Sequence, residues 1–158
     1  MLNNKKILIT GIANKFSIAN GIAQSMSKNG AELAFAYQNE RLLKKIKPIA
    51  DDLGVKTLIE CDVACDKSIE QTFSQLKDDW GTLDGIVHSI GFAPSDQLDG
   101  DFTEVTTREG FQIAHDISSY SFTALAKGAL PILSDKAALL TLTYLGSIQS
   151  LPNYNVMG

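Results

Sequence analysis

Short apolar runs alternate along the chain with stretches in which apolar residues recur every three or four positions. The runs predict buried β-strands, and the spaced positions predict amphipathic helices. Strands are predicted at residues 6–10, 33–37, 55–61, 83–88 and 138–143. Helices are predicted at 17–29, from Leu42 onward, at 66–79 and at 108–130. Pro48 is expected to kink the second helix or end it early.

The order βαβαβαβαβ, with mostly short connections, predicts an α/β fold of the Rossmann type. This is a doubly wound parallel sheet with helices on both faces. For a Rossmann-type sheet we expect five strands in the order 3-2-1-4-5, within one domain over residues 1–158. A polar loop from about residue 92 to 107 is expected before the long last helix.

Composition narrows the range of partners. A chain of 158 residues that is 44% hydrophobic can bury one sizeable core. A net charge of −4 disfavours nucleic acid and anionic membranes as partners. We see no signal peptide and no apolar stretch of the roughly 18–20 residues that a membrane span needs. Cys61 and Cys65 have no second Cys or His pair at metal spacing, so reduced thiols and no metal site are expected.

The residues after the first predicted strand form a candidate phosphate-binding turn. Gly11 permits a tight turn, Ser17 can cap the next helix and offer its hydroxyl to a phosphate, and Ala19 is small enough for close helix–strand packing. The usual G-x-G-x-x-G pattern is absent. The alternative to a phosphate-binding turn therefore remains that Gly11 only forms a turn and Ser17 only caps the helix.

The end of the second predicted strand bears on cofactor choice. Gln38 is neutral and can bond the adenosine ribose hydroxyls of NAD, whereas an NADP site needs cationic groups for the 2′-phosphate. Arg41 could approach such a phosphate, but a first-turn helix residue more often faces water. The pattern favours NADH.

Candidate adenine and ribose contacts follow the third and fourth predicted strands. A carboxylate at Asp62 could accept from the adenine amino group while Val63 packs on the ring, although an isolated Asp is also a common turn former. Gly91 would let the backbone approach the ribose, with Ile90 packing against it. His88 ends an apolar strand and is interpreted as a core histidine rather than a catalytic base.

Tyr144 and Tyr154, ten residues apart, follow the end of the fifth predicted strand and are the candidate catalytic residues. The carboxyl ends of parallel strands are where open α/β sheets build their active sites. A phenol with an ordinary pKa of about 10 is a poor acid at neutral pH unless a nearby cation stabilises its anion. Because no lysine follows Lys136, packing alone remains the alternative for both rings.

Together these segments resemble one family along the whole chain, the bacterial NADH-dependent enoyl-[acyl-carrier-protein] reductases. That family is a divergent branch of the short-chain dehydrogenases/reductases. The resemblance rests on Gly11 with Ser17-Ile18-Ala19, and on residues 33–37, 61–63, 88–93, 97–101, 114–122 and 152–158.

The resemblance implies a cytoplasmic, homotetrameric oxidoreductase of type II fatty acid synthesis with NAD as its cofactor. It implies reduction of a trans-2-enoyl thioester on acyl carrier protein, with hydride passing to the β-carbon. Tyr154 would hydrogen-bond the thioester oxygen, Tyr144 would line the same pocket, and Ala93 would lie near the substrate. The implied cofactor contacts are Gly11, Ser17, Ile18, Gln38, Asp62, Val63 and Ile90.

The chain departs from the family pattern at its end. The family's lysine would lie three positions past Gly158, and the sixth and seventh strands would follow it. We therefore expect an N-terminal portion that is inactive by itself, with its last strand covered by further chain or by a partner. One alternative is a carbonyl or alcohol reductase of the same superfamily, which is disfavoured because Tyr-x-x-x-Lys would require Lys at position 158. Another is a nucleotide-binding module without turnover.

Overall fold

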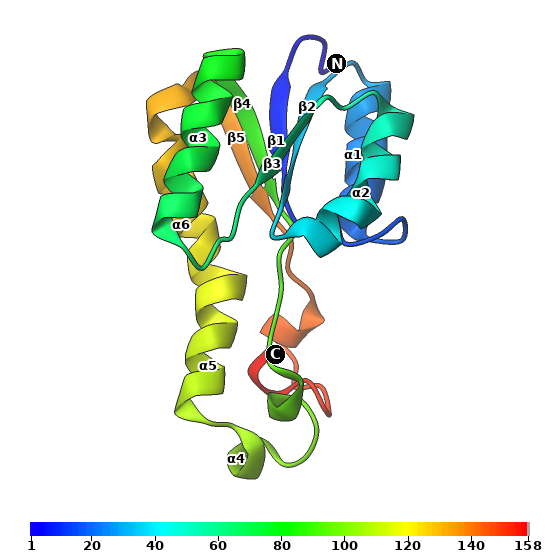
Figure 1. The fold of residues 1–158 in the computed structure, drawn as a ribbon. Helices are drawn as coiled ribbons and strands as arrows, with labels where there is room; N and C mark the ends of the chain where they lie inside the picture. Colours follow the sequence, from blue (N-terminus) through cyan, green and yellow to red (C-terminus); the bar gives the residue numbers. More distant parts are fainter. Residues whose placement is uncertain (158) are drawn as a thin grey trace.

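The computed structural model describes residues 1–157, which form a five-stranded parallel sheet in the order β3-β2-β1-β4-β5 (Figure 1). The strands are β1 (Lys6–Ile9), β2 (Glu32–Tyr37), β3 (Thr57–Glu60), β4 (Leu83–His88) and β5 (Leu133–Thr141). One face carries α1 (Ile18–Lys28) and α2 (Glu40–Leu53), and the other carries α3 (Asp66–Trp80) and α6 (Ser121–Ala129). The predicted doubly wound sheet and its strand order are confirmed.

Two apolar cores lie on opposite faces of the sheet. Successive side chains of a strand point to opposite faces, so β1 contributes to both cores. Leu8 packs in the core that holds Phe73 of α3, whereas Ile9 packs in the core that holds Ala19 of α1 and Ile46 of α2. Burial on both faces explains why the strands appear as continuous apolar runs rather than as alternating patterns.

The long helix predicted at 108–130 is interrupted by a wider turn. It consists of α5 (Arg108–His115), a π-helical turn (Asp116–Tyr120) and α6. The preceding loop contains a short 3₁₀ turn (Ser95–Gln97) and α4 (Phe102–Val105). Figure 1 shows α4, α5 and the C-terminal segment together in a lobe below the sheet.

The structure corrects the expected bounds of β5 and α2. β5 begins earlier than residue 138, because Leu133 already pairs with Leu83 and an irregularity follows before Ala138 pairs with Gly85. Apolar periodicity does not detect a strand that starts through such an irregularity. Of the two effects expected at Pro48, an early end of the helix is not observed, because α2 continues through Pro48 to Leu53. Packing of its buried face outweighs the missing N–H.

Within residues 1–157, no strand pairs with the outer edge of β5. β5 is the last strand of the sheet, and Leu140 near its end is 46% exposed. Unpaired backbone groups beside exposed apolar side chains favour pairing with another strand.

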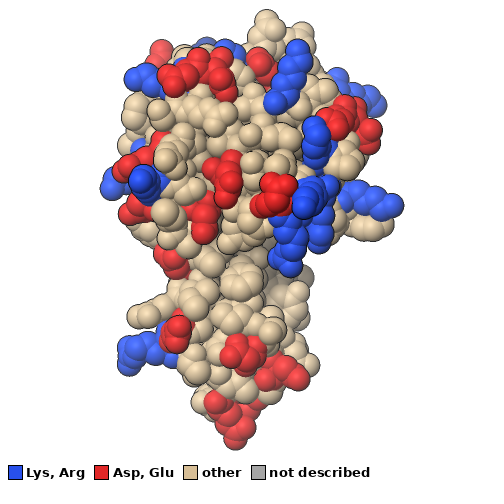
Figure 2. All heavy atoms as spheres, viewed as in Figure 1, with Lys and Arg blue, Asp and Glu red and all other residues tan. Residues whose placement is uncertain are grey.

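Charged side chains of both signs are interspersed over the sheet-and-helix body on the face seen in Figure 2, whereas the tip of the lobe is mainly acidic. The lobe carries exposed carboxylates at Asp99, Asp101 and Glu104. Separately, none of the helices within residues 1–157 has the length and apolar character that crossing a bilayer requires.

A half-buried carboxylate connects three strands at the amino-terminal edge of the sheet. Asp84 accepts hydrogen bonds from Lys5 Nζ at 2.8 Å, from the Lys6 N–H at 3.0 Å and from Ser134 Oγ at 2.9 Å. Burial acts to raise the pKa of Asp84, but these hydrogen bonds outweigh it and hold the pKa below the ordinary carboxyl value. The ionised form therefore stabilises the fold.

We expect Asp84→Asn to lower the free energy of unfolding at pH 7 by about 1–2 kcal/mol, because three donors lose a charged acceptor. In the unaltered chain this contribution is present above the unfolded pKa of about 3.9 and is lost as pH falls through the lower folded pKa. Urea unfolding at several pH values measures both effects. Asp51→Asn is the control, since Asp51 forms an exposed pair with Lys47 at 3.5 Å. Equal losses in both variants would contradict this prediction.

Candidate functional site

A pocket of about 410 Å³ opens at the carboxyl ends of β1, β2, β3 and β4. Parallel strands place their following loops at this edge, which is where open α/β sheets bind ligands. Five of the predicted cofactor residues line the pocket, namely Gly11, Gln38, Asp62, Val63 and Ile90.

Gly11 occupies a position that no other residue fits. Its φ of +81° lies in the left-handed region, and a Cβ added here would overlap the backbone carbonyl of Ser89. The close approach is fixed by Thr10, whose N–H donates to the Val87 carbonyl at 2.9 Å and whose Oγ1 donates to the same carbonyl at 3.1 Å. The ends of β1 and β4 therefore form a single narrow wall of the pocket.

Ser17 and Ile18 lie outside the lining of this pocket. Ser17 holds the cap position of α1, but its Oγ donates backwards to the Asn14 carbonyl at 2.7 Å and makes no capping bond to the helix. Ile18 is 69% exposed. The expected close packing of Ala19 is confirmed, since this residue is fully buried.

The adenosine side of the pocket combines one carboxylate with apolar surface. Asp62 is half-buried, and its Oδ1 accepts from the Ala64 N–H at 3.2 Å. Its own N–H donates to Ser68 Oγ at 2.9 Å, which fixes the backbone there. Val63 is buried beside it, and the exposed Gln38 lies on the same rim. A flat heterocycle with an exocyclic amine would find both an acceptor and a packing surface here.

Ser118 supports the pocket and was not predicted as a site residue. Its Oγ accepts from the Phe92 N–H and donates to the Phe92 carbonyl, both at 2.9 Å. Phe92 and the neighbouring Ile117 line the pocket. The feature of the sequence that could have identified Ser118 is its position, as a polar residue, on the apolar face of the predicted long helix.

The two candidate catalytic tyrosines lie together, with ring centroids 5.3 Å apart at 45°. Tyr144 donates its phenol to the Met157 carbonyl at 2.7 Å, and burial together with Tyr154 raises the pKa of Tyr144. The Tyr154 side chain is 45% exposed, and its hydroxyl makes no hydrogen bond to the residues that the structure describes. Of the two phenols, Tyr154 is thus the one able to donate to a ligand.

Asparagines hold the backbone on both sides of Tyr154. Asn153 and Asn155 have φ values of 60° and 40°, a left-handed conformation that asparagine tolerates well. Asn155 Nδ2 donates to the Leu98 carbonyl at 3.2 Å and to the Gly100 carbonyl at 3.3 Å. The lobe below the sheet therefore positions Tyr154.

The tyrosine segment borders the cofactor-type pocket. The Met157 methyl group lies 3.4 Å from the position of a Cβ at Gly91, and Met157 Sδ lies 3.9 Å from Ser118 Oγ. Ala93, the predicted substrate neighbour, is half-buried just beyond the lining of the pocket. Gly158, where the alternative Tyr-x-x-x-Lys pattern requires lysine, lies outside the described residues.

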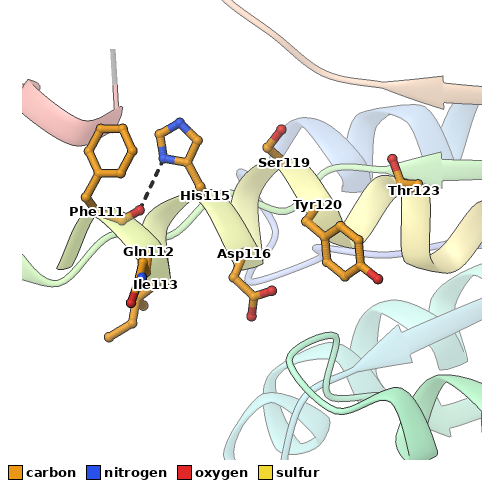
Figure 3. A pocket seen from close by; sticks show the side chains of 8 residues that line it. All are labelled: Phe111, Gln112, Ile113, His115, Asp116, Ser119, Tyr120 and Thr123. Carbon is orange, nitrogen blue, oxygen red and sulfur yellow. Dashed lines mark hydrogen bonds between the residues drawn. The ribbon is translucent and has the colours of Figure 1, made fainter. Parts of the chain in front are cut away.

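A larger hollow of about 780 Å³ lies along the outside of α5, the π-helical turn and α6. Figure 3 shows its side chains projecting from one helical stretch, with the His115 ring stacked on Phe111 at a centroid distance of 4.2 Å. It is an open face of a helix rather than a cleft between elements. None of the predicted site residues lines it.

A sequence model of the family described as Enoyl-(Acyl carrier protein) reductase matches residues 11–158. The enoyl-[acyl-carrier-protein] reductase [NADH] FabI of Escherichia coli (strain K12) is 57% identical over 157 residues, covering 99% of this chain and 60% of that protein. The protein of the same description from Enterococcus faecalis is 46% identical, covering 99% of this chain and 62% of that protein.

The solved structures that resemble this chain are also enoyl-[acyl-carrier-protein] reductases. The enoyl-[acyl-carrier-protein] reductase (NADH) of Aquifex aeolicus matches with a TM-score of 0.95 at 44% identity, over 99% of this chain and 62% of that one. The reductase of Anaplasma phagocytophilum in complex with NAD matches with a TM-score of 0.95 at 39% identity, over 99% and 60%. The chain spans about 60% of the length of the curated relatives it matches.

Proposed function

This chain belongs to the enoyl-(acyl carrier protein) reductase family, and from that premise we propose that its protein reduces trans-2-enoyl thioesters on acyl carrier protein with NADH, in type II fatty acid synthesis. The observation that carries the proposal is the position of Tyr154. Its phenol is half-exposed and lies on a segment that borders the pocket at the carboxyl ends of the strands.

Residues 1–158 would form the dinucleotide-binding domain of this protein. When bound, NADH supplies the hydride that reduces the β-carbon. Gly11 allows close approach of the backbone, Asp62 offers an acceptor to the adenine amine, and Val63 and Ile90 provide packing surface. Ser17 and Ile18 would contact the phosphate-bearing part of the cofactor from the start of α1, an anion-attracting helix end.

Tyr154 would donate a hydrogen bond to the thioester oxygen and stabilise the negative charge that develops there on reduction. Tyr144 would shape the same pocket, because its own phenol donates to the Met157 carbonyl. Ala93 would lie near the acyl group. Family membership also underlies our proposals of a homotetramer and of a cytoplasmic location for the complete protein.

We expect the chain to bind NADPH at least about tenfold more weakly than NADH, a difference of about 1.4 kcal/mol. The exposed Gln38 on the pocket rim is neutral and offers no cation to a 2′-phosphate. Titrations that follow nicotinamide fluorescence measure both affinities. Gln38→Arg should reduce the difference between the NADH and NADPH affinities. Gln71→Arg adds the same charge on α3 and should leave that difference unchanged. Equal affinities in the unaltered chain would show that another cation, such as Arg41, reaches the ribose.

The proposed reaction is tested on the protein at the full length of its relatives. Oxidation of NADH with crotonyl thioester, and not with a panel of ketones, is the expected result. Turnover of ketones alone would favour the carbonyl reductase alternative. Binding of NADH without any turnover would favour a nucleotide-binding module.

A further inference from the structure

His88 lies at the end of β4 and is 1% exposed, directly before a residue that lines the pocket. Its Nδ1 lies 2.9 Å from Thr141 Oγ1 at the end of β5. Its Nε2 lies 2.7 Å from Ser121 Oγ at the start of α6. The ring also packs against Phe122, at a centroid distance of 5.5 Å. One imidazole therefore connects two strands with the helix that covers them.

The hydrogen bonds determine which nitrogen carries the proton. Ser121 Oγ donates its single proton to the Ile117 carbonyl at 2.6 Å, so it must accept from His88 Nε2. Burial lowers the pKa of His88, and the ring is neutral at pH 7. The remaining nitrogen, Nδ1, then accepts from the Thr141 hydroxyl.

The partner of this imidazole belongs to the π-helical turn. Ser121 follows the turn directly, and its hydroxyl bonds back to Ile117 within it. Ile117 lines the pocket, and Ser118 holds both backbone polar groups of Phe92. The wide turn thus carries one wall of the pocket, in keeping with the tendency of π-bulges to occur at functional sites.

We propose that His88, as the neutral Nε2–H tautomer, is a positioning residue that holds the π-helical turn at the end of the sheet and so fixes the pocket wall formed by Ile117, Ser118 and Phe92. This deepens the proposed function, since it assigns that wall to the NADH site. The role of the His88–Ser121 hydrogen bond in holding the turn can be tested without a cofactor.

The first test is ¹⁵N NMR of the histidine side chains in the unaltered chain at pH 7. We expect one neutral ring with its proton on Nε2, in addition to the exposed His115. A His88 ring protonated on Nδ1, or on both nitrogens, would overturn the proposal. This measurement needs no variant that could fail to fold.

The second test compares Ser121→Ala with Ser119→Ala. Both remove one hydroxyl from the same stretch of helix, but Ser119 is exposed and makes no side-chain hydrogen bond within residues 1–157. We expect amide hydrogen exchange at Phe92 to be faster in Ser121→Ala, and NADH to bind about fivefold more weakly, as for one lost hydrogen bond. Ser119→Ala should match the unaltered chain in both measurements.

Unchanged exchange at Phe92 in Ser121→Ala would overturn the proposal even if NADH affinity falls. If neither the unaltered chain nor the two serine variants bound NADH, the proposed cofactor would be refuted, and with it the assignment of this wall to an NADH site. Faster amide exchange at Phe92 in Ser121→Ala would then still support the role of the His88–Ser121 hydrogen bond in holding the turn. His88→Gln adds a check by partial rescue, because its side-chain amide can donate to Ser121 where His88→Ala cannot.

Discussion

Replacing Gly11 with alanine is expected to destabilise the chain by at least about 2 kcal/mol and to weaken NADH binding more than about tenfold. The new Cβ would overlap the Ser89 carbonyl, and the residue would have to keep a φ of +81°. Relief would require β1 and β4 to separate where Thr10 bonds the Val87 carbonyl. Urea unfolding and NADH titration of the same preparations measure the two losses.

Gly21→Ala is the matched control. Gly21 lies within α1, and no heavy atom lies within 4 Å of the added Cβ. Alanine should therefore raise stability by about 0.5–1 kcal/mol through its better helix propensity. If Gly11→Ala were as stable as Gly21→Ala and bound NADH equally well, the narrow turn would not be the cofactor wall that we propose.

Tyr154→Phe is expected to lower turnover of an enoyl thioester by about 10²-fold in the full-length protein, with NADH affinity unchanged. The substitution removes only the hydroxyl that would donate to the thioester oxygen, and that hydroxyl makes no hydrogen bond to residues 1–157. The loss should appear in kcat, because the hydrogen bond strengthens as charge develops on the oxygen. Steady-state kinetics with crotonyl thioester provides the measurement.

Two other phenols serve as controls for that substitution. Tyr120→Phe removes an exposed hydroxyl from the π-helical turn and should leave turnover unchanged. Tyr144→Phe removes the donor to the Met157 carbonyl and should lower stability as well as turnover. A larger loss of turnover in Tyr144→Phe, without a loss of stability, would exchange the roles of Tyr144 and Tyr154.

The sequence was sufficient to predict the sheet and part of the pocket. Continuous apolar runs identified the strands, and the loops after parallel strands necessarily meet at one edge. This is why Gly11, Asp62 and Ile90 could be grouped before their positions were known. The alternating order of strands and helices likewise predicted a parallel sheet, and the Rossmann-type fold class supplied the strand order that the structure has.

The support for the site could not be predicted in the same way. Ser118 meets Phe92 across 26 residues, and His88 meets Ser121 across 33. Such pairs depend on how a loop folds and on where a helix widens, and helical periodicity carries neither kind of information. Asn155 is a similar case, because its partners lie in a lobe that the sequence indicated only as a polar loop.

The central position of β1 has a consequence for folding kinetics. β1 is made first, yet it lies between β2 and β4, and Ile7 pairs with both Leu33 and Gly85. The pairing with β2 closes a short loop through α1, whereas the pairing with β4 must bring together residues that are far apart in the chain. Closing the longer loop costs more entropy before any contact repays it. The half of the sheet built on β1, α1 and β2 should therefore form early, with α3, β4 and the pocket wall completed in a slower phase.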